Sequence, residues 1–183
     1  MSEIYEPAED SYLMVEALEE QIPTLLAKTP ELKFLEIGCG SGINMQTALD
    51  LGIKRENIFG CDINKDAVKH CKKLGFTSVA SDLFDKIEGK FDIIVFNPPY
   101  LPLDKDEPDF SKKITTGGLK GNEITLNFLE QAKEYLSEKG KIFLITSSLA
   151  KEVDFGMLGY EAKEILSKKL FFEKLVVWEC LKV

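Results

Sequence analysis

The sequence contains very little arginine and no excess of positive charge. Arg55 is the only arginine among 23 basic residues, and 31 acidic residues bring the formal net charge to −8. Proteins that read nucleic acids usually carry a basic face with arginines that bind phosphates and guanine edges. A nucleic-acid substrate is therefore disfavoured, although the composition does not exclude a local patch of lysines. Electrostatic steering instead favours a basic macromolecular partner.

Long hydrophobic runs are also lacking. The longest apolar runs, such as Phe91–Phe96, cover about a third of a membrane span, and the first ten residues are acidic. We therefore expect no signal peptide, no transmembrane helix, no membrane partner and a cytoplasmic location. The 183 residues suffice for one hydrophobic core, so we expect a single domain over residues 1–183.

Cysteine and histidine are too sparse and too scattered for a metal centre. No Cys-X-X-Cys pair occurs, and one histidine, His70, accompanies four cysteines: Cys39, Cys61, Cys71 and Cys180. Structural zinc sites need closely spaced pairs of such ligands. We expect no metal, and we interpret the cysteines as reduced thiols in the core of a cytosolic protein.

Short apolar runs alternate with helical stretches along the chain. Runs of Ile, Val and Phe bounded by turn signals indicate buried parallel strands. We expect strands at Lys33–Ile37, Asn57–Asp62, Thr77–Ala80, Phe91–Phe96 and Lys141–Thr146. Helices are expected from Asp10 or Ser11 to Gln21, over Lys65–Leu74 after an Asn64 cap, and from Asn122 or Glu123 to Tyr135 before Gly140.

This alternation predicts an α/β fold with a parallel, doubly wound sheet. The tail Lys169–Val183 contains two β-like pieces with little between them, so we expect an antiparallel hairpin at the sheet edge. The long connection Leu101–Gly121 carries four carboxylates and two prolines. Connections of this length inside a domain are usually functional.

A glycine-rich turn follows the first expected strand and opens a helix, in the run Glu36-Ile-Gly-Cys-Gly-Ser-Gly42. Gly38 and Gly40 allow a tight turn and a close approach to a ligand. Asp62 ends the next strand, 20 residues after Gly42, where an acid can bind both hydroxyls of a ribose. The third glycine comes one position too early for the dinucleotide fingerprint, and Glu36 would repel a pyrophosphate. S-Adenosylmethionine, which carries a sulfonium and an ammonium, suits this turn better than NAD(P).

The turn Asn97-Pro98-Pro99-Tyr100 follows the fourth expected strand, over the crevice where doubly wound sheets bind ligands. Its prolines fix the backbone and leave carbonyls free to accept hydrogen bonds. The Asn97 side-chain oxygen and the Pro98 carbonyl can accept both hydrogens of a planar –NH2 group, and Tyr100 can stack on its face. These acceptors would orient the nitrogen lone pair for methyl transfer without a covalent intermediate.

These motifs resemble, in order and spacing, those of amino-group N-methyltransferases of the Rossmann-like class. The resemblance rests on Glu36–Gly40, Asp62, Ser81-Asp82-Leu83 and Asn97–Tyr100. It implies a class I S-adenosylmethionine-dependent methyltransferase fold with a central, mostly parallel seven-stranded sheet. Helices would cover both faces of the sheet, and a C-terminal antiparallel hairpin would complete it.

Two further segments narrow the resemblance. Tyr5-Glu-Pro-Ala-Glu-Asp-Ser11 is similar to the start of the short, eukaryotic and archaeal branch of HemK-like release-factor glutamine methyltransferases. Thr116-Gly-Gly-Leu-Lys-Gly121 before a helix is similar to the same branch. The acidic loop Leu101–Phe110 and the stretch Phe171–Trp178 depart from the pattern. We expect no counterpart of the helical substrate-binding domain of the longer bacterial form.

The resemblance implies roles for individual residues. Asn97, Pro98 and Tyr100 would be catalytic. Residues 1–30 would form a helical lid segment within the domain. Contacts with S-adenosylmethionine, from its methionine part through the ribose to the adenine, are implied for Tyr5, Ser11, Glu36, Gly38, Gly40, Asp62, Asp82, Leu83 and Asn97.

The substrate implied by this family is the glutamine in the Gly-Gly-Gln loop of a class 1 translation release factor, methylated at N5. The family also implies a small zinc-binding activator protein on the exposed edge of the sheet, expected at Phe76–Ala80. Protein lysine methylation and adenine-N6 or rRNA methylation are the alternatives among methyltransferases. An inactive cofactor-binding subunit and an NAD(P) enzyme are the alternatives outside that class.

Overall fold

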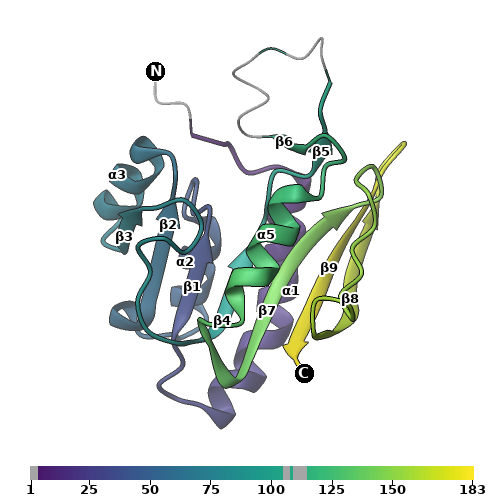
Figure 1. The fold of residues 1–183 in the computed structure, drawn as a ribbon. Coiled ribbons are helices and arrows are strands. Elements are labelled where there is room, and N and C mark those ends of the chain that lie inside the picture. Colours follow the sequence, from purple (N-terminus) through teal and green to yellow (C-terminus); the bar gives the residue numbers. More distant parts are fainter. Residues whose placement is uncertain (1–3, 105–107, 109–114) are drawn as a thin grey trace.

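The computed structural model describes residues 4–104, 108 and 115–183, and its centre is a seven-stranded sheet (Figure 1). The strands lie in the order β3-β2-β1-β4-β7-β9-β8. The first five in this order are parallel, whereas β9 pairs antiparallel with both β7 and β8. Their bounds are β1 Phe34–Ile37, β2 Ile58–Asp62, β3 Thr77–Ala80, β4 Phe91–Phe96, β7 Leu136–Ser147, β8 Tyr160–Lys169 and β9 Lys174–Lys182. The predicted fold class is confirmed, including the C-terminal antiparallel hairpin.

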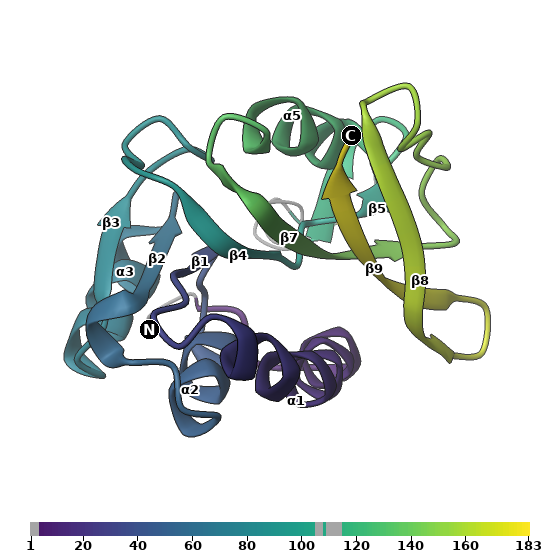
Figure 2. The same cartoon turned by 90° about the horizontal axis from the view of Figure 1, so that it is seen from below.

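Helices cover both faces of this sheet (Figure 2). Helices α1 (Glu9–Lys28), α2 (Ile43–Asp50) and α3 (Lys65–Lys73) lie on one face, and α5 (Glu123–Ala132) lies on the other. A 3-10 turn, η1 (Arg55–Asn57), precedes β2. None of the helices among the described residues is long and apolar enough to cross a membrane.

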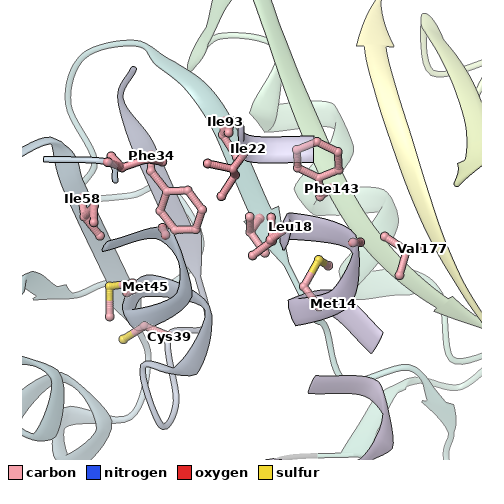
Figure 3. Close-up of a cluster of buried hydrophobic side chains, with 14 of the residues drawn as sticks. Met14, Leu18, Ile22, Phe34, Cys39, Met45, Ile58, Ile93, Phe143 and Val177 are labelled. Atoms are coloured by element: carbon pink, nitrogen blue, oxygen red, sulfur yellow. The ribbon is translucent and has the colours of Figure 1, made fainter. Parts of the chain in front are cut away.

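Each face of the sheet has its own hydrophobic cluster. Under α1 and α2, Met14, Leu18 and Ile22 pack against sheet residues such as Phe34 and Phe143 (Figure 3). Under α5 the core is largely aromatic, with the rings of Phe84, Phe96, Phe128 and Tyr135 in contact. All four cysteines are buried and form no disulfide.

Helix α1 departs from the sequence prediction at both ends. Its N-cap is Ala8 rather than Asp10 or Ser11. Ser11 still contributes to the cap, because its Oγ accepts the Ala8 N–H at 3.4 Å, whereas the buried Asp10 carboxylate bonds to other groups. The helix continues through Pro23 to Lys28. Beyond the proline, Leu25 and Leu26 pack against the core, and this burial offsets the lost backbone hydrogen bond.

Other boundaries also moved. Strand β7 begins at Leu136, five residues earlier than expected, so Gly140 lies inside it. A glycine is needed at this position because a Cβ there would sit 2.8 Å from the Phe91 carbonyl oxygen. Helix α5 consequently ends at Ala132 instead of Tyr135. The first strand of the hairpin, β8, precedes Lys169 rather than following it. The Asn64 cap of α3 is confirmed by its bond from the Asp66 N–H, at 2.9 Å.

The long connection after β4 contains a small second sheet. Strands β5 (Leu101–Pro102) and β6 (Thr116–Gly118) pair in parallel beside the end of β4. Three of the four carboxylates predicted in the acidic loop, those of Asp106, Glu107 and Asp109, lie outside the described residues.

Candidate active site

A cavity of about 1040 Å³ opens at the carboxyl ends of β1, β2 and β4. This is the edge where ligands bind in doubly wound sheets. The cavity is lined by every residue that the sequence singled out: Tyr5, Ser11, Glu36, Gly38, Gly40, Asp62, Asp82, Leu83, Asn97, Pro98 and Tyr100. The structure thus brings together five segments separated by up to 95 residues.

The glycine turn between β1 and α2 requires its glycines. Gly38, Gly40 and Gly42 have φ of +67°, +43° and +77°, in the left-handed region that favours glycine. Asp62, at the end of β2, accepts the Gly40 N–H at 2.9 Å and the Asn64 N–H at 2.8 Å, one on each oxygen. Each oxygen keeps a second lone pair, so the carboxylate can bind the turn and also accept hydrogen bonds from hydroxyl groups.

Glu36 lies beneath this turn and is almost fully buried, with 3% of its surface exposed. Its Oε1 accepts from Asn44 Nδ2 at 2.7 Å, but its Oε2 has no hydrogen-bond partner in the part of the chain that the structure describes. Burial raises the pKa of the Glu36 carboxyl well above its usual range, although the Asn44 bond opposes this. The Asn44 Oδ1 atom is also buried, and no residue within 4–104, 108 or 115–183 donates to it.

On the opposite wall, the side-chain amide of Asn97 is held in one orientation. Its Nδ2 donates to Asp10 Oδ2 at 3.1 Å, and the Tyr100 hydroxyl donates to the same oxygen at 3.3 Å. Asn97 Oδ1 is buried and has no partner among the described residues. The donor end of the amide is therefore fixed on a carboxylate, and its acceptor end is left for a ligand.

Asp10 is a site residue that the sequence analysis missed. It is 6% exposed and also accepts the Tyr5 hydroxyl at 2.8 Å and the Ser11 N–H at 2.7 Å, both on Oδ1. Burial and the nearby Asp10 charge raise the pKa values of Tyr5 and Tyr100. One carboxylate thus joins the N-terminal segment to the Asn97–Tyr100 turn. The signal was present in the Tyr5–Ser11 motif, but an acid at a helix start was interpreted as a cap.

A glycine loop supports the Asn97–Tyr100 turn from behind. A Cβ at Gly117, in β6, would lie 2.5 Å from the Pro99 carbonyl oxygen and 2.3 Å from that of Gly121. A Cβ at Gly121, where φ is +83°, would lie 2.4 Å from the Tyr100 oxygen. Backbone-to-backbone packing of this closeness requires glycine.

The far end of the cavity has one strained residue. Leu83 has a φ of 42° and is the one non-glycine residue with positive φ in the part of the chain that the structure describes. Its carbonyl accepts from Cys61 Sγ at 3.3 Å. Asp82 is exposed at the rim, and Ile63, directly after Asp62, is 73% exposed. Strain of this kind concentrates at ligand sites.

The unpaired acceptors indicate what the cavity can hold. Four buried side-chain oxygens lack a partner among the described residues, and three of them belong to residues that line this cavity: Glu36, Asn44 and Asn97. Buried polar atoms normally have partners, and a site lined by such acceptors requires a ligand that donates hydrogen bonds or carries positive charge. The ammonium of S-adenosylmethionine and the –NH2 of an acceptor amide meet this requirement.

Comparisons with known proteins agree with this geometry. A family profile described as the methyltransferase small domain matches residues 9–158. The chain belongs to this methyltransferase family. A Methanocaldococcus jannaschii protein named as a protein N5-glutamine methyltransferase is 36% identical over 187 residues, covering 96% of this methyltransferase and 90% of the relative.

Two further comparisons concern eukaryotic proteins. The eRF1 methyltransferase catalytic subunit of Schizosaccharomyces pombe is 31% identical over 166 residues, covering 78% of this methyltransferase and 72% of the relative. A chain of the solved Mtq2–Trm112 complex of E. cuniculi matches with a TM-score of 0.73 and 24% identity. The match covers 99% of this methyltransferase and 99% of the matched chain. Its description assigns that complex to the methylation of the eRF1 termination factor. The predicted resemblance to HemK-like methyltransferases and the predicted fold are confirmed.

Proposed function

We propose that the chain transfers a methyl group from S-adenosylmethionine to the side-chain amide nitrogen of a protein glutamine. The target is the Gly-Gly-Gln loop of a class 1 translation release factor. Relatives with more than 30% identity are named for glutamine N5 or eRF1 methylation, which supports this choice over lysine and adenine. The net charge of −8 also disfavours a nucleic-acid substrate.

The observation that carries the proposal is the unpaired Asn97 Oδ1 atom, fixed by the bond from Asn97 Nδ2 to Asp10. Together with the Pro98 carbonyl it accepts the two N–H bonds of the incoming amide. These acceptors favour positive charge that develops on the nitrogen, and they point its lone pair along the axis of transfer. No strong base is needed beforehand, since the N–H group becomes acidic only as the methyl arrives.

The remaining residues of the cavity hold the cofactor, which supplies an electrophilic methyl when bound. Glu36 and the Gly38–Gly40 turn border its methionine part, and the unpaired Glu36 Oε2 accepts from the ammonium. Asp62 binds the ribose hydroxyls. Asp82 and Leu83 contact the adenine, whereas Tyr5 and Ser11, in the lid segment of residues 1–30, close over the cofactor.

The chain acts as one methyltransferase domain, in the cytoplasm, with a small zinc-binding activator protein as partner. The partner binds at the β3 edge of the sheet. This position is supported by the sheet order, since β3 is at one end of it and pairs on one side only among the described residues. An unpaired edge of this kind accepts a strand from another protein.

A series of acceptor peptides tests the proposed substrate. Four peptides carry Gln, Asn, Lys or Glu at the position flanked by Gly-Gly, and transfer of labelled methyl groups from S-adenosylmethionine is measured at one enzyme concentration. We expect transfer to Gln at the highest rate and none to Glu, which has no N–H to offer. A Lys peptide that is methylated faster than the Gln peptide would overturn the amide assignment.

A further inference from the structure

The turn of the C-terminal hairpin carries two fully exposed phenylalanines. Leu170 and Glu173 close the turn between β8 and β9, with the Leu170 N–H donating to the Glu173 carbonyl at 2.7 Å. Phe171 and Phe172 occupy its two central positions and are 99% and 94% exposed. We refer to these two side chains as the aromatic tip.

Neither the turn nor the core explains the aromatic tip. Two-residue hairpin turns favour Asn, Asp and Gly at their central positions, and turn residues in general are small or polar. Phe171 and Phe172 contribute almost no burial to the fold, yet each exposes a large apolar ring to water. Exposed aromatic side chains without a structural role mark surfaces that bind another molecule.

The turn that carries the aromatic tip is bonded to the carboxyl end of β7. Glu173 Oε1 accepts the hydroxyl of Ser147, the last residue of β7, at 2.6 Å. The Ser148 N–H donates to the Lys174 carbonyl at 2.9 Å, and the Lys174 N–H donates to Ser148 Oγ at 2.8 Å. These bonds hold the turn at the carboxyl end of β7, the same end of the sheet as β5 and β6 (Figure 1). The cavity lies at this end as well, since its lining includes residues that follow β1, β2 and β4.

Two contacts extend this connection to the residues of the site. Lys168, at the end of β8, forms an ion pair with Glu9, which directly precedes Asp10. Glu173 lies close enough to Tyr5 and Tyr100 for its charge to help raise their pKa values. The turn is therefore pre-organised beside the mouth of the cavity, which lowers the entropy cost of using it in binding.

We propose that the aromatic tip is a docking surface for the body of the protein substrate, an inference that rests on the proposed function. Asn97 Oδ1 is buried, so a glutamine reaches it only from a protruding loop, and the protein behind that loop must rest on the rim of the cavity. The tip lies beside this rim on the β8 side, connected to it through the Lys168–Glu9 ion pair, and offers two aromatic anchors for an apolar patch. The β3 edge lies at the opposite end of the sheet order, so an activator there leaves the tip free.

The test compares a whole release factor with a short Gly-Gly-Gln peptide as acceptors. The double variant Phe171→Ser/Phe172→Ser removes the tip and no buried contact, and unchanged thermal unfolding verifies the fold. The matched control is Met157→Ser, which removes an 85% exposed apolar side chain beyond the opposite end of the same hairpin.

We expect kcat/KM of the tip variant on the whole factor to fall by about tenfold or more, mainly through KM, because interface anchors each contribute over about 1 kcal/mol. Its kcat/KM on the peptide and both values for the Met157 control should stay within about twofold of wild type. An equal loss on peptide and whole factor, or no loss on either, would overturn the tip proposal. Wild-type inactivity on both acceptors would instead contradict the proposed function itself.

Discussion

Two residues of the site, Asn97 and Glu36, each keep one acceptor oxygen available for a ligand. Asp10 binds the donor end of Asn97, and Asn44 binds one oxygen of Glu36, so an acceptor is left unpaired in each case. Unpaired buried acceptors cost on the order of 1–3 kcal/mol each in the empty protein. That cost is recovered when a ligand supplies the missing donors, so the residues trade stability for binding.

Asn97→Ala should slow methyl transfer far more than it weakens cofactor binding. The variant removes one of two fixed acceptors at the moment the nitrogen gains positive charge, and deletion of such a group costs about 10²–10³ in rate. Most proposed cofactor contacts come from other residues, so affinity for S-adenosylmethionine should change much less. Single-turnover methylation and calorimetry, performed in parallel, separate the two effects. A variant that keeps more than about a tenth of the wild-type rate would make the Asn97–Tyr100 turn a scaffold only.

Asp10→Asn provides the companion variant. It leaves Asn97 in place but removes the charge that binds its Nδ2, so the amide is no longer held with its oxygen toward the substrate. We expect kcat to fall with Asn97 intact, and Asp10→Glu to restore part of it because a carboxylate returns. An unchanged kcat in Asp10→Asn would remove Asp10 from the positioning of Asn97.

Glu36→Gln should stabilise the empty protein and weaken the cofactor complex. Burial raises the folded-state pKa of Glu36, so its contribution to stability is full below the unfolded pKa, near pH 4.5, and is lost as pH rises through the raised value. The Gln variant lacks this loss and should unfold at a higher temperature than wild type at pH 8. Loss of a charge-assisted bond to the ammonium, about 1.5–3 kcal/mol, should lower affinity about tenfold or more.

The pH dependence of binding provides a second measurement of the same group. A cationic ligand favours the Glu36 carboxylate, so wild-type affinity should rise as pH passes upward through the raised pKa, with release of a proton. Calorimetry in buffers of different ionisation enthalpy detects that proton. A wild-type affinity with the same pH profile as Glu36→Gln would contradict the assignment of Glu36 to the ammonium.

Local motifs made much of the site predictable from the sequence. Gly38, Asp62 and Asn97 could be identified as site residues because each lies in a turn or at a strand end that faces the ligand edge of the sheet. Asp10 could not be predicted in the same way, since its partners Asn97 and Tyr100 are about 90 residues away. The exposed Ile63 beside Asp62 also lines the cavity, but the sequence analysis did not identify it, because a single apolar residue forms no recognisable pattern.

At the scale of elements, the β5–β6 pair and the glycine loop pack against the Asn97–Tyr100 turn and support its position. Gly117→Ala would place a Cβ 2.5 Å from the Pro99 carbonyl oxygen, and backbone must shift to accommodate it. We expect destabilisation of about 1–3 kcal/mol and a lower kcat, because the turn moves with its support. Gly156→Ala is the control, since its nearest atom would be 3.5 Å away. Denaturant unfolding and kcat for both variants measure this, and equal effects would contradict the supporting role.

Strand boundaries were predicted best in the parallel part of the sheet. Strands β1, β2 and β4 lie within one residue of their expected positions, because apolar runs mark them, and the short edge strand β3 has its expected bounds. Strand β8 is an edge strand whose residues are mostly polar and exposed, so no apolar run indicated it. The extent of α1 depended on packing of its last turn against the core, which tertiary structure alone decides.

The charge of the whole molecule leads to a prediction about salt. A protein substrate bound through apolar and amide contacts should lose only a small factor in kcat/KM between 50 and 200 mM salt. A nucleic acid bound through six to ten phosphates would lose about 10³–10⁵ in affinity over that range. Rates at several salt concentrations, with the release factor and with an RNA oligonucleotide as acceptors, distinguish the two. A steep salt dependence with transfer to RNA would overturn the choice of a protein substrate.

The central claim, methylation of a glutamine amide in a release factor, has a direct measurement. A class 1 release factor is incubated with the enzyme and S-adenosylmethionine, and tandem mass spectrometry then locates any added methyl group. The account predicts one methyl on the side chain of the glutamine in the Gly-Gly-Gln loop, at a level greatly reduced when Asn97→Ala replaces the wild type. A methyl group found only on lysine, or an unmodified factor under conditions where the enzyme binds S-adenosylmethionine, would contradict it.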